Sequence, residues 1–436
     1  MLGRLDMKRD MADDEVLDII ESIVLQKSGE RYYPLAERKR LTERVFNSIR
    51  RLDVIQPLID DAGITEIMVN GHRDIFIERE GKVAKTDFFF ETSEKLEDVI
   101  QSIVSKVNRT VNEATPIVDA RLSDGSRVNV VLRPIAIDGP VLTIRKFPEK
   151  PMSIERLLMF GSIDEGIAEL LNVLVRARYN LFISGGTGSG KTSLLNAVAA
   201  MIPPEERVIT IEDSAELQLK SLKNLVRLET RNANTEGKGQ IDMGNLIKSS
   251  LRMRPDRILV GEVRDGLAAY YMLQSMNTGH DGSLTTGHAN SARDMLSRLE
   301  TMVLSEEAVP LEAIRQQVAS AIDVIVHVAR LRDGSRKVVE ISELDGLRDG
   351  QIVLNRLYEF AERPKDEIRP TGETRPIDEI GEFRSTGGFR EKRGSPRAPE
   401  EGAVHGVFRQ TGNLIRNTTK LRLAGLSSPF FEAETV

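Results

Sequence analysis

Apolar residues near the start of the chain recur at helical spacing. Between 14 and 26 they follow an acidic first turn, and between 35 and 52 they form one stripe on a highly charged stretch. The many Lys and Arg residues of the second stretch fit a solvated face better than a binding surface. The pattern therefore predicts an N-terminal helical segment over residues 1–52.

From residue 65 the pattern changes to short β-branched runs bounded by turn residues, which is typical of strands. These runs occupy 67–69, 75–77, 128–132 and 141–144. A helical stretch at 93–107 lies among them, so we predict a smaller α+β domain over 53–147. Prolines at 148 and 151 restrict the backbone to extended conformations and predict a hinge at 148–153.

Beyond the hinge, helical stretches alternate with apolar, β-branched runs. The runs lie at 181–184, 208–211, 258–260 and 322–328. Such alternation predicts an α/β domain built on a mostly parallel sheet, over 154–360. The remaining residues, 361–436, are highly charged. They are predicted to form a flexible tail, most charged over 363–402, with one short amphipathic segment at 414–423 that is expected to dock back onto the core.

Composition narrows the classes of protein that fit this pattern. The chain has 436 residues with 61 Lys and Arg against 67 Asp and Glu, a net charge of −6, which disfavours a protein that binds nucleic acid through phosphates. It has no cysteine, which excludes disulfides, thiol catalysis and thiolate zinc sites. The sequence holds no apolar stretch long enough to span a membrane and begins without an apolar signal core, so we expect a cytoplasmic location.

The strongest motif is Gly-Gly-Thr-Gly-Ser-Gly-Lys-Thr at 185–192, a full match to G-x-x-x-x-G-K-[ST] between an apolar run and a helical stretch. Its glycines let backbone N–H groups face phosphate oxygens, and the helix N-terminus adds partial positive charge. Lys191 is expected to reach the β- and γ-phosphates and the Thr192 hydroxyl to ligate Mg²⁺. The residues predicted to bind ATP here are Gly185, Gly186, Thr187, Gly188, Ser189, Gly190, Lys191, Thr192 and Ser193.

Two apolar runs of this domain end in acidic residues. Glu212 and Asp213 follow one run, and Glu262 follows the other after Gly261. Because the carboxyl ends of parallel strands line the ligand crevice, these acids are expected to face the phosphates. Glu262 is predicted to orient or activate water, with Glu212 as a further catalytic residue and Asp213 in cofactor binding. Many NTPases have Asp where Gly261 stands.

Because Gly261 cannot coordinate a metal through a side chain, the expected ligands of Mg²⁺ are Thr192, water, and Glu212 or Asp213. The structural alternative for each acid is a carboxylate that caps the next helix. His280 and His288 lie in a Gly-, Ser- and Thr-rich stretch with no further ligand nearby for a zinc site. We interpret 278–290 as a loop that senses the γ-phosphate, with His288 among the nucleotide-binding residues.

Together these motifs resemble the secretion ATPase superfamily, which powers type II and type IV secretion and pilus assembly. Four ordered stretches carry the resemblance: the phosphate loop at 185–192, an aspartate box at 210–217, a Walker B stretch at 258–264 and a histidine box at 278–290. Three upstream stretches resemble the superfamily's N-terminal domain: 65–71, 119–127 and 138–147. The absence of a four-Cys zinc module makes the chain most similar to the CpaF branch, the ATPases of tight-adherence (Flp-type) pili.

The resemblance implies a RecA-like P-loop NTPase domain behind a nucleotide-sensing N-terminal domain, a homo-hexameric ring, and ATP with Mg²⁺ as cofactors. It also implies peripheral association with the inner face of the cytoplasmic membrane, a membrane platform protein as partner, and no requirement for DNA or RNA. By motif match, Arg127 and Arg145 of the N-terminal domain would reach the phosphates. Arg121 and Arg133 stay open as alternatives.

The predicted reaction is hydrolysis of ATP to ADP and phosphate, with closure of the N-terminal domain over the γ-phosphate driving pilus assembly or protein secretion. Three alternatives differ in what the site would serve. The first is a DNA-transfer ATPase of conjugation with the same chemistry, and the second is a translocase stimulated by nucleic acid. The third is a scaffold that binds ATP without turnover, which an intact Glu262 argues against.

Overall fold

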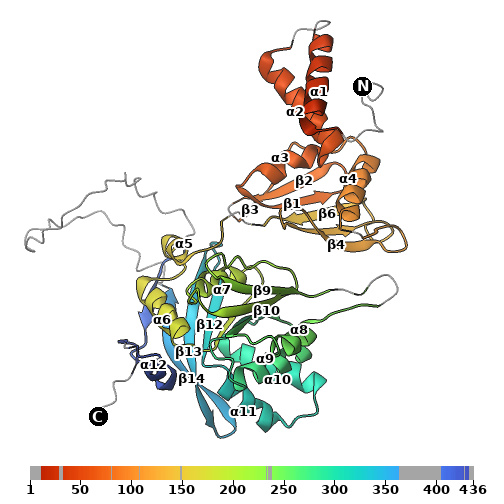
Figure 1. Cartoon of the computed structure of the whole chain (residues 1–436). Helices are drawn as coiled ribbons and strands as arrows, with labels where there is room; N and C mark the ends of the chain where they lie inside the picture. Colours follow the sequence, from red (N-terminus) through yellow and green to blue (C-terminus); the bar gives the residue numbers. More distant parts are fainter. Residues whose placement is uncertain are drawn as a thin grey trace, which may run out of the picture. The chain divides into compact units, whose positions relative to one another are not determined.

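The computed structural model describes residues 11–28, 33–79, 81–107, 109–147, 150–231, 233, 238–362, 404–426 and 428–431. The chain divides into two compact units, Met1–Lys150 and Pro151–Val436 (Figure 1). Two stretches with sequence predictions, 148–149 in the hinge and 363–403 in the charged tail, lie outside the described residues. Among the described residues no helix is both long and apolar enough to cross a membrane.

The first unit begins with a helical hairpin. Helices α1 (Asp13–Ser28) and α2 (Leu35–Arg50) pack against each other around Val16, Ile20 and Phe46. A 3₁₀ turn, η2 (Asp53–Ile55), and a short helix, α3 (Gln56–Asp60), lead into the sheet. The two helices that the apolar spacing predicts are therefore present.

An antiparallel sheet with one covering helix forms the rest of this unit. Its strand order is β3-β2-β1-β6-β5-β4, and α4 (Ser93–Ser105) contributes apolar residues to the same core as the strands. The strands are β1 (Ile64–Asn70), β2 (Asp74–Arg79), β3 (Lys82–Lys85), β4 (Ile117–Arg121), β5 (Arg127–Val131) and β6 (Val141–Arg145). Alternate residues of β5 and β6, such as Val128 and Ile144, are buried in that core, so Arg127 and Arg145 lie on the opposite face.

The second unit contains a nine-stranded sheet of order β15-β14-β13-β12-β7-β11-β10-β8-β9. The six strands from β12 to β9 pair in parallel, and β13, β14 and β15 add antiparallel at the other side. The strands are β7 (Leu181–Gly185), β8 (Arg207–Glu212), β9 (Asn224–Glu229), β10 (Arg257–Val263), β11 (Leu284–His288), β12 (Val324–Arg330), β13 (Arg336–Arg348), β14 (Gln351–Glu362) and β15 (Gly406–Gln410).

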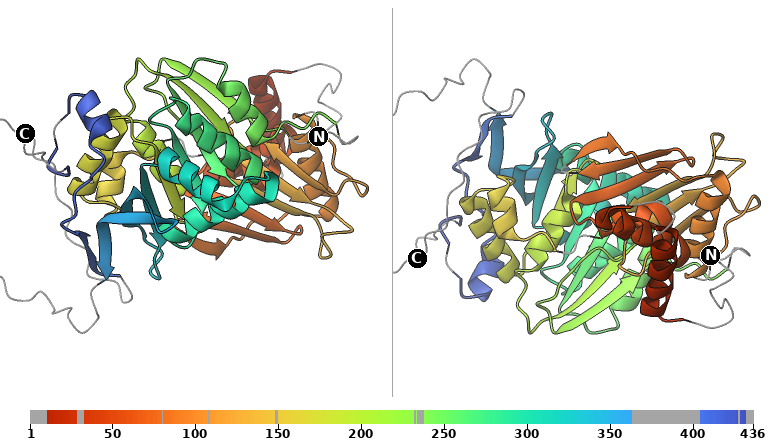
Figure 2. Two further views of the ribbon diagram at one scale, coloured as in Figure 1. Left: turned by 90° about the horizontal axis from the view of Figure 1, so that it is seen from below. Right: turned by 90° about the horizontal axis from the view of Figure 1, so that it is seen from above.

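Helices cover both faces of the parallel part of this sheet. Along β7, Leu181 and Ile183 pack against α5, α6 and α7, whereas Phe182 packs against α8, α9, α10 and α11. Figure 2 shows the last four helices, in green to cyan, grouped together. The helices are α5 (Ile154–Met159), α6 (Glu165–Arg176), α7 (Lys191–Ala199), α8 (Met243–Ser250), α9 (Gly266–Asn277), α10 (Ala292–Glu306) and α11 (Leu311–Ala321). The mixed α/β architecture agrees with the alternation in the sequence.

The predicted flexible tail over 361–436 is corrected at both of its ends. Strand β14 continues to Glu362, and residues 404–431, the C-terminal segment, belong to the second unit. This segment adds β15 to the edge of the sheet and contains α12 (Thr419–Leu423), which lies beside α6 in every view (Figures 1 and 2). Ile415 and Leu421, within the predicted amphipathic stretch 414–423, and Phe431 beyond it are buried in the core.

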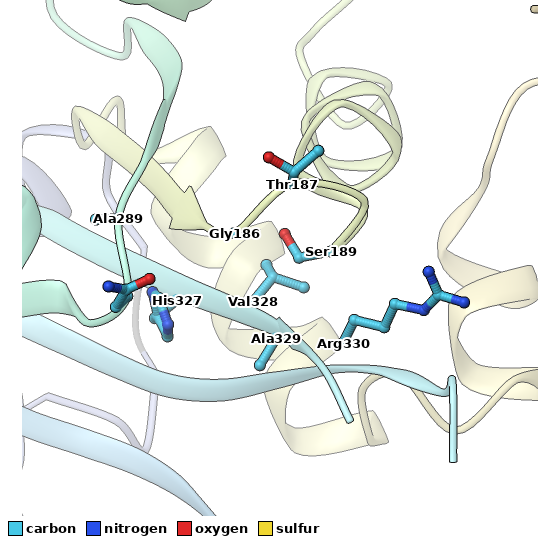
Figure 3. Close-up of a pocket in the computed structure, with 9 residues that line it drawn as sticks. Gly186, Thr187, Ser189, Ala289, His327, Val328, Ala329 and Arg330 are labelled. Atoms are coloured by element: carbon cyan, nitrogen blue, oxygen red, sulfur yellow. The ribbon is translucent and has the colours of Figure 1, made fainter. Parts of the chain in front are cut away.

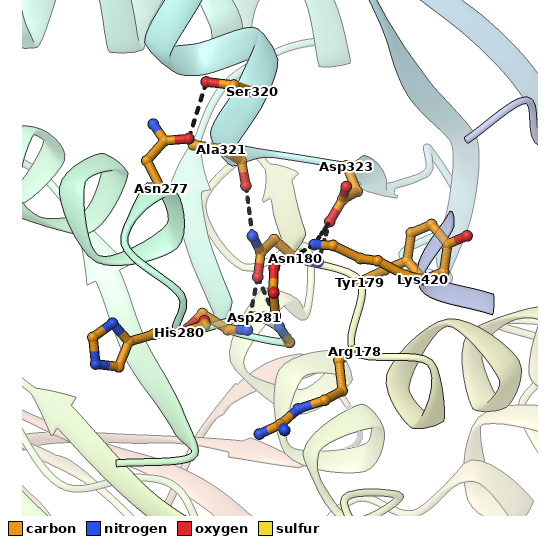
Figure 4. Close-up of polar contacts among 12 residues, drawn as sticks. Arg178, Tyr179, Asn180, Asn277, His280, Asp281, Ser320, Ala321, Asp323 and Lys420 are labelled. Carbon is orange, nitrogen blue, oxygen red and sulfur yellow. Dashed lines mark hydrogen bonds and ion pairs between the residues drawn. The ribbon is translucent and has the colours of Figure 1, made fainter. Parts of the chain in front are cut away.

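Buried polar contacts fix the C-terminal segment to the start of the parallel strands (Figure 4). The Asp323 carboxylate accepts hydrogen bonds from Asn180 N at 2.7 Å and Lys420 Nζ at 2.6 Å. The Asn180 side chain in turn accepts from the backbone N–H groups of Gly282 and Ser283, at 2.8 and 3.0 Å. The segment is therefore bonded to the loop before β11 and to the loop before β12.

Candidate active site

A phosphate loop, residues 185–190, joins the buried strand β7 to α7. Gly188 and Gly190 have φ of +70° and +97°, in the left-handed region that favours glycine. A Cβ at Gly185 would lie 2.3 Å from Val328 O and 2.6 Å from Ser189 Oγ, so only glycine fits where β7 passes β12. The motif glycines thus occupy the places where the backbone needs them. Thr187 is exposed on the loop, and Gly186 has open space beside it.

Lys191 begins α7 and folds back over the phosphate loop. Its side chain is buried, and its Nζ donates to Gly186 O at 2.9 Å and lies 3.2 Å from His288 Nδ1. Burial lowers the pKa of Lys191, and the nearby Glu262 carboxylate opposes that shift. Thr192 and Ser193 follow in the first turn of α7, where both are half-buried.

Four of the predicted residues join one polar chain. His288, at the end of β11, lies beside Lys191 and places its Nε2 2.6 Å from Glu262 Oε1. The second oxygen of Glu262 accepts from Arg264 at 2.9 Å, and Arg264 also lies 3.0 Å from an oxygen of Asp213. The order along the polar chain is therefore Lys191, His288, Glu262, Arg264 and Asp213. The parallel pairing of β8, β10 and β11 brings their carboxyl ends to one edge and so assembles it.

The surroundings of His288 favour the neutral form of its imidazole ring. Burial lowers the pKa of His288, and Lys191 and Arg264 lower it further against the opposing effect of Glu262. In a neutral ring Nδ1 can accept from Lys191 Nζ, while Nε2 makes a close contact with Glu262 Oε1 that lacks the alignment of a hydrogen bond. His288 therefore lies between Lys191, beside the phosphate loop, and Glu262, the acid predicted to act on water.

Glu212 lies outside this polar chain. One of its oxygens accepts from the backbone N–H groups of Glu216 and Leu217, at 2.7 and 3.0 Å, and so holds the loop after β8; no helix begins there, so this is not the helix-capping alternative. Its other oxygen is buried without a hydrogen-bond partner among the residues described. A Cβ at Gly261 would lie 3.0 Å from Glu212 Cγ, which explains why a larger residue does not stand there.

That unpaired oxygen and the Thr192 hydroxyl are oxygen donors of the kind that Mg²⁺ prefers, so the residues present fit the ion. His280 does not join them. It precedes β11 whereas His288 ends it, and its Nδ1 lies 3.2 Å from Ser275 O. Within the described ranges no cluster of three or more His, Asp or Glu residues could hold a metal.

The stretch 278–290 is also not the simple loop that its composition indicated, because residues 284–288 form β11, an interior strand between β7 and β10. Its polar residues are accommodated inside the sheet. Thr285 and Thr286 are buried, and the Thr286 hydroxyl donates to Gly261 O at 2.7 Å.

The predicted arginines of the first unit lie in cross-strand register. Arg127 on β5 pairs with Arg121 on β4 and with Arg145 on β6, and Arg145 pairs with Glu66 on β1. We call Arg121, Arg127 and Arg145 the arginine row. Burial raises the pKa of Glu66, and Arg145 opposes that shift. Arg133 is exposed and lies beyond the end of β5, outside the row.

Sequence reasoning missed three residues around the phosphate loop. Arg264 was not selected, although it shares a side of the chain with Glu262 two positions earlier. His327 on β12 is buried 2.8 Å from Ser184 Oγ, and Arg336 donates to Gly188 O at 2.9 Å. His327 and Arg336 come from strands more than 140 positions further along the chain, so no local pattern links them to the loop.

A small pocket of about 220 Å³ opens beside the loop (Figure 3). It is lined by Gly186, Thr187, Ser189, Ala289, Asn290, His327, Val328, Ala329 and Arg330. The buried hydroxyl of Ser189 has no hydrogen-bond partner among the described residues. The strand next to β7 therefore also shapes the surroundings of the phosphate loop.

Comparisons with known proteins show the family of the chain. The family model described as type II/IV secretion system protein matches residues 50–366. The conjugal transfer protein TrbB of Rhizobium radiobacter is 36% identical over 320 residues, covering 72% of this chain and 94% of that protein. The type IV secretion system protein VirB11 of Bartonella henselae is 30% identical over 340 residues, covering 69% and 93%.

Among solved structures, the VirB11 ATPase from the Brucella suis type IV secretion system, in complex with sulphate, is 29% identical. It covers 66% of this chain and 95% of that chain, with a TM-score of 0.37. Because the family model spans more than half of the sequence, the chain belongs to the type II/IV secretion system protein family.

Proposed function

We propose that this member of the type II/IV secretion system family is the ATP-hydrolysing motor of a type IV secretion machine of the conjugal-transfer kind. The chain is an ATPase. The observation that carries the proposal is the polar chain from Lys191 through His288 to Glu262, which joins the phosphate loop to an acid at the edge of the parallel sheet. The TrbB and VirB11 relatives support the transfer machinery as its setting.

In the proposed reaction the backbone N–H groups of the phosphate loop and Lys191 Nζ bind the β- and γ-phosphates. Glu262 orients water and accepts its proton as the new O–P bond forms and the bond between the γ-phosphorus and the bridging oxygen breaks, releasing ADP. Thr192 and the unpaired oxygen of Glu212 would hold Mg²⁺, which neutralises phosphate charge when bound. Asp213 acts through Arg264 on the same edge.

The arginine row supports a second part of the proposal. Its three residues lie opposite one another on neighbouring strands, and the guanidinium group of Arg is suited to contact with phosphate oxygens. Arg127 and Arg145 would contact the triphosphate by bidentate hydrogen bonds. Loss of the γ-phosphate would remove those contacts, which converts hydrolysis into domain movement.

We further propose that the motor is a homo-hexamer that works at the cytoplasmic face of the membrane on a platform protein. Both features follow from the family resemblance. Nucleotide between the RecA-like domain and the arginine row would then lie near a neighbouring subunit. DNA or RNA is not required for turnover in this proposal.

Two substitutions test the assignment of the active site. Lys191→Ala removes the charge beside the loop, and Glu262→Gln removes the group that accepts the proton. We expect each to lower kcat by about 100-fold or more in a phosphate-release assay under multiple turnover, because positioning and electrostatics supply most of the rate enhancement. Wild-type turnover in both variants would contradict the proposal, and no turnover in the wild type would favour a nucleotide-gated scaffold.

Assembly of a tight-adherence pilus is the second candidate function. The absence of cysteine favours it, because it separates the chain from relatives that carry a four-Cys zinc module. Deleting the gene separates the two functions, since loss of surface pili with normal DNA transfer would identify the pilus motor. Loss of transfer with normal pili would identify the conjugal one.

A further inference from the structure

Arg264 belongs to the polar chain, yet the proposed reaction gives it no direct contact with the nucleotide or with water. It uses two different nitrogens to contact two different acids. One lies 2.9 Å from Glu262 Oε2 and the other 3.0 Å from Asp213 Oδ2. A planar guanidinium with several N–H donors can bridge two carboxylates in this way, whereas a single ammonium nitrogen cannot reproduce the geometry.

Local structure explains how the three side chains meet. Strand β10 ends at Val263, and the period of two places Glu262 and Arg264 on the same side of the chain. Asp213 comes directly after the last residue of β8, the parallel neighbour of β10. Asp213 is itself held, because Thr230 Oγ1 lies 3.4 Å from its Oδ1. Arg264 therefore links the carboxyl ends of two strands.

The Glu262 carboxylate is held from two sides. His288 Nε2 lies 2.6 Å from one oxygen and Arg264 lies 2.9 Å from the other. Rotation of the carboxylate about its last side-chain bond would break both contacts at once. The orientation of this acid therefore depends on Arg264 as well as on His288.

A purely structural role does not account for Arg264. Its side chain is 56% exposed, and ion pairs at exposed positions contribute little to stability. The ion pair between Arg264 and Asp213 also covers no hydrophobic core, since Asp213 is exposed too. What the arrangement does fix is the direction of the Glu262 carboxylate and its link to the residue after β8.

We propose that Arg264 is a positioning residue for hydrolysis, which holds Glu262 in the orientation that acts on water and uses Asp213 as its anchor. The inference rests on the proposed function. Arg264 does not touch the nucleotide in this proposal, so its loss changes the rate of the chemical step and leaves the binding of ATP by the phosphate loop intact. Misplacement of a catalytic group by about 1 Å can cost about 100-fold in rate.

The test compares four variants of the full chain: Arg264→Gln, Arg264→Lys, Asp213→Asn and the double variant Arg264→Gln/Asp213→Asn. We expect Arg264→Gln to lower kcat by about tenfold to 100-fold with KM for ATP unchanged within about threefold. Arg264→Lys keeps the charge and is expected to recover part of the rate. Asp213→Asn is expected to lower kcat by a smaller factor, and the double variant to be no slower than Arg264→Gln, because the two act as one unit.

Arg315→Gln serves as the matched control, since Arg315 pairs with Glu300 between α10 and α11 in the same unit. It is expected to keep the wild-type kcat. An unchanged kcat in Arg264→Gln would overturn the proposal, and so would a raised KM with normal kcat, which would indicate direct contact with ATP. A fall in melting temperature that accounts for the lost rate would overturn it as well. Two other results would overturn the proposed function itself. One is a wild-type protein without ATP turnover, and the other is a Glu262→Gln variant that turns over ATP at the wild-type rate.

Discussion

Two imidazoles near the phosphate loop are both shifted toward the neutral form. His288 connects Lys191 to Glu262, and His327 is buried beside Ser184 on the neighbouring strand. Burial lowers the pKa of His327, against smaller opposing effects from Glu340 and from a hydrogen bond with the Asn290 backbone. Protonation of either ring would place a new positive charge near Lys191.

His327→Asn tests this at the level of stability. Because the folded pKa of His327 lies below its unfolded value of about 6.5, the unfolded chain binds the proton more readily, and the free energy of unfolding falls as pH drops from about 6.5 through the folded pKa. The neutral amide removes that contribution. We therefore expect a shallower loss of stability between pH 7.5 and 5 in denaturant titrations, by about 1.4 kcal/mol for each unit of pKa shift removed.

His405→Asn is the control for this prediction, since His405 is exposed. Any change of slope that His405→Asn shares with His327→Asn is then not specific to the buried imidazole. An equal slope for wild type and His327→Asn would show that the buried imidazole carries no part of the pH dependence.

At the scale of single residues, the sequence indicated what lay inside a contiguous motif or at the end of an apolar run. Lys191 and Glu262 are of this kind, and the structure places both on the polar chain. Arg264 and Arg336 were not selected. The contact of Arg336 with Gly188 depends on the pairing of β12 with β7 and of β13 with β12, which is set by tertiary packing.

At the scale of elements, the C-terminal segment shows how buried acids tie distant parts of the unit together. Glu343 on β13 accepts hydrogen bonds from the backbone N–H groups of Arg416 and Asn417. Asp323 accepts from Lys420, which also lies 2.7 Å from Asp281. Both Asp323 and Glu343 are buried, so without the segment they would lose these partners. The segment thus completes the hydrogen bonding of the sheet it covers.

Lys420→Met tests this connection. Removing one partner of a buried ion pair leaves an uncompensated charge, so we expect a loss of about 2–4 kcal/mol in the free energy of unfolding at pH 8, measured in urea. Burial raises the pKa of Asp323 and Lys420 opposes that shift, so the variant holds a proton on Asp323 more readily. The loss should therefore shrink as pH falls toward 5.

Lys220→Met removes a charge from an exposed position and should change stability by less than about 0.5 kcal/mol. A loss for Lys420→Met no larger than this control would mean that the pair with Asp323 does not hold the segment in place.

Hydrophobic periodicity predicted the elements whose side chains alternate or form apolar runs, such as α2, β7 and β10. It missed β3, which is exposed along its whole length, and β11, whose Thr-Thr-Gly-His sequence has the composition of a loop. Strand β11 fits inside the sheet because the buried Thr286 hydroxyl donates to Gly261 O, and because Gly287 leaves room for Phe182. Such fits depend on neighbours that a local pattern does not contain.

At the scale of the whole molecule, the predicted boundary near 148–153 is close to the division of the chain at Lys150 and Pro151. The arginine row belongs to the first unit and the phosphate loop to the second. The amphipathic stretch 414–423 indicated docking onto the core, and Ile415 and Leu421 are buried there, whereas the strand β15 before it was not predicted.

The charge of the whole chain leads to the last prediction. A net charge of −6, 5% aromatic residues and no Trp provide neither a basic groove nor stacking platforms for single strands. We therefore expect single-stranded DNA to leave the ATPase rate unchanged within about twofold at 50 mM salt, where phosphate contacts are strongest. Heparin, a polyanion without bases, controls for charge alone. A DNA-specific gain in rate that fades as salt rises to 200 mM would contradict the prediction, and would mean that the relatives' role in conjugal transfer involves direct handling of DNA by this subunit.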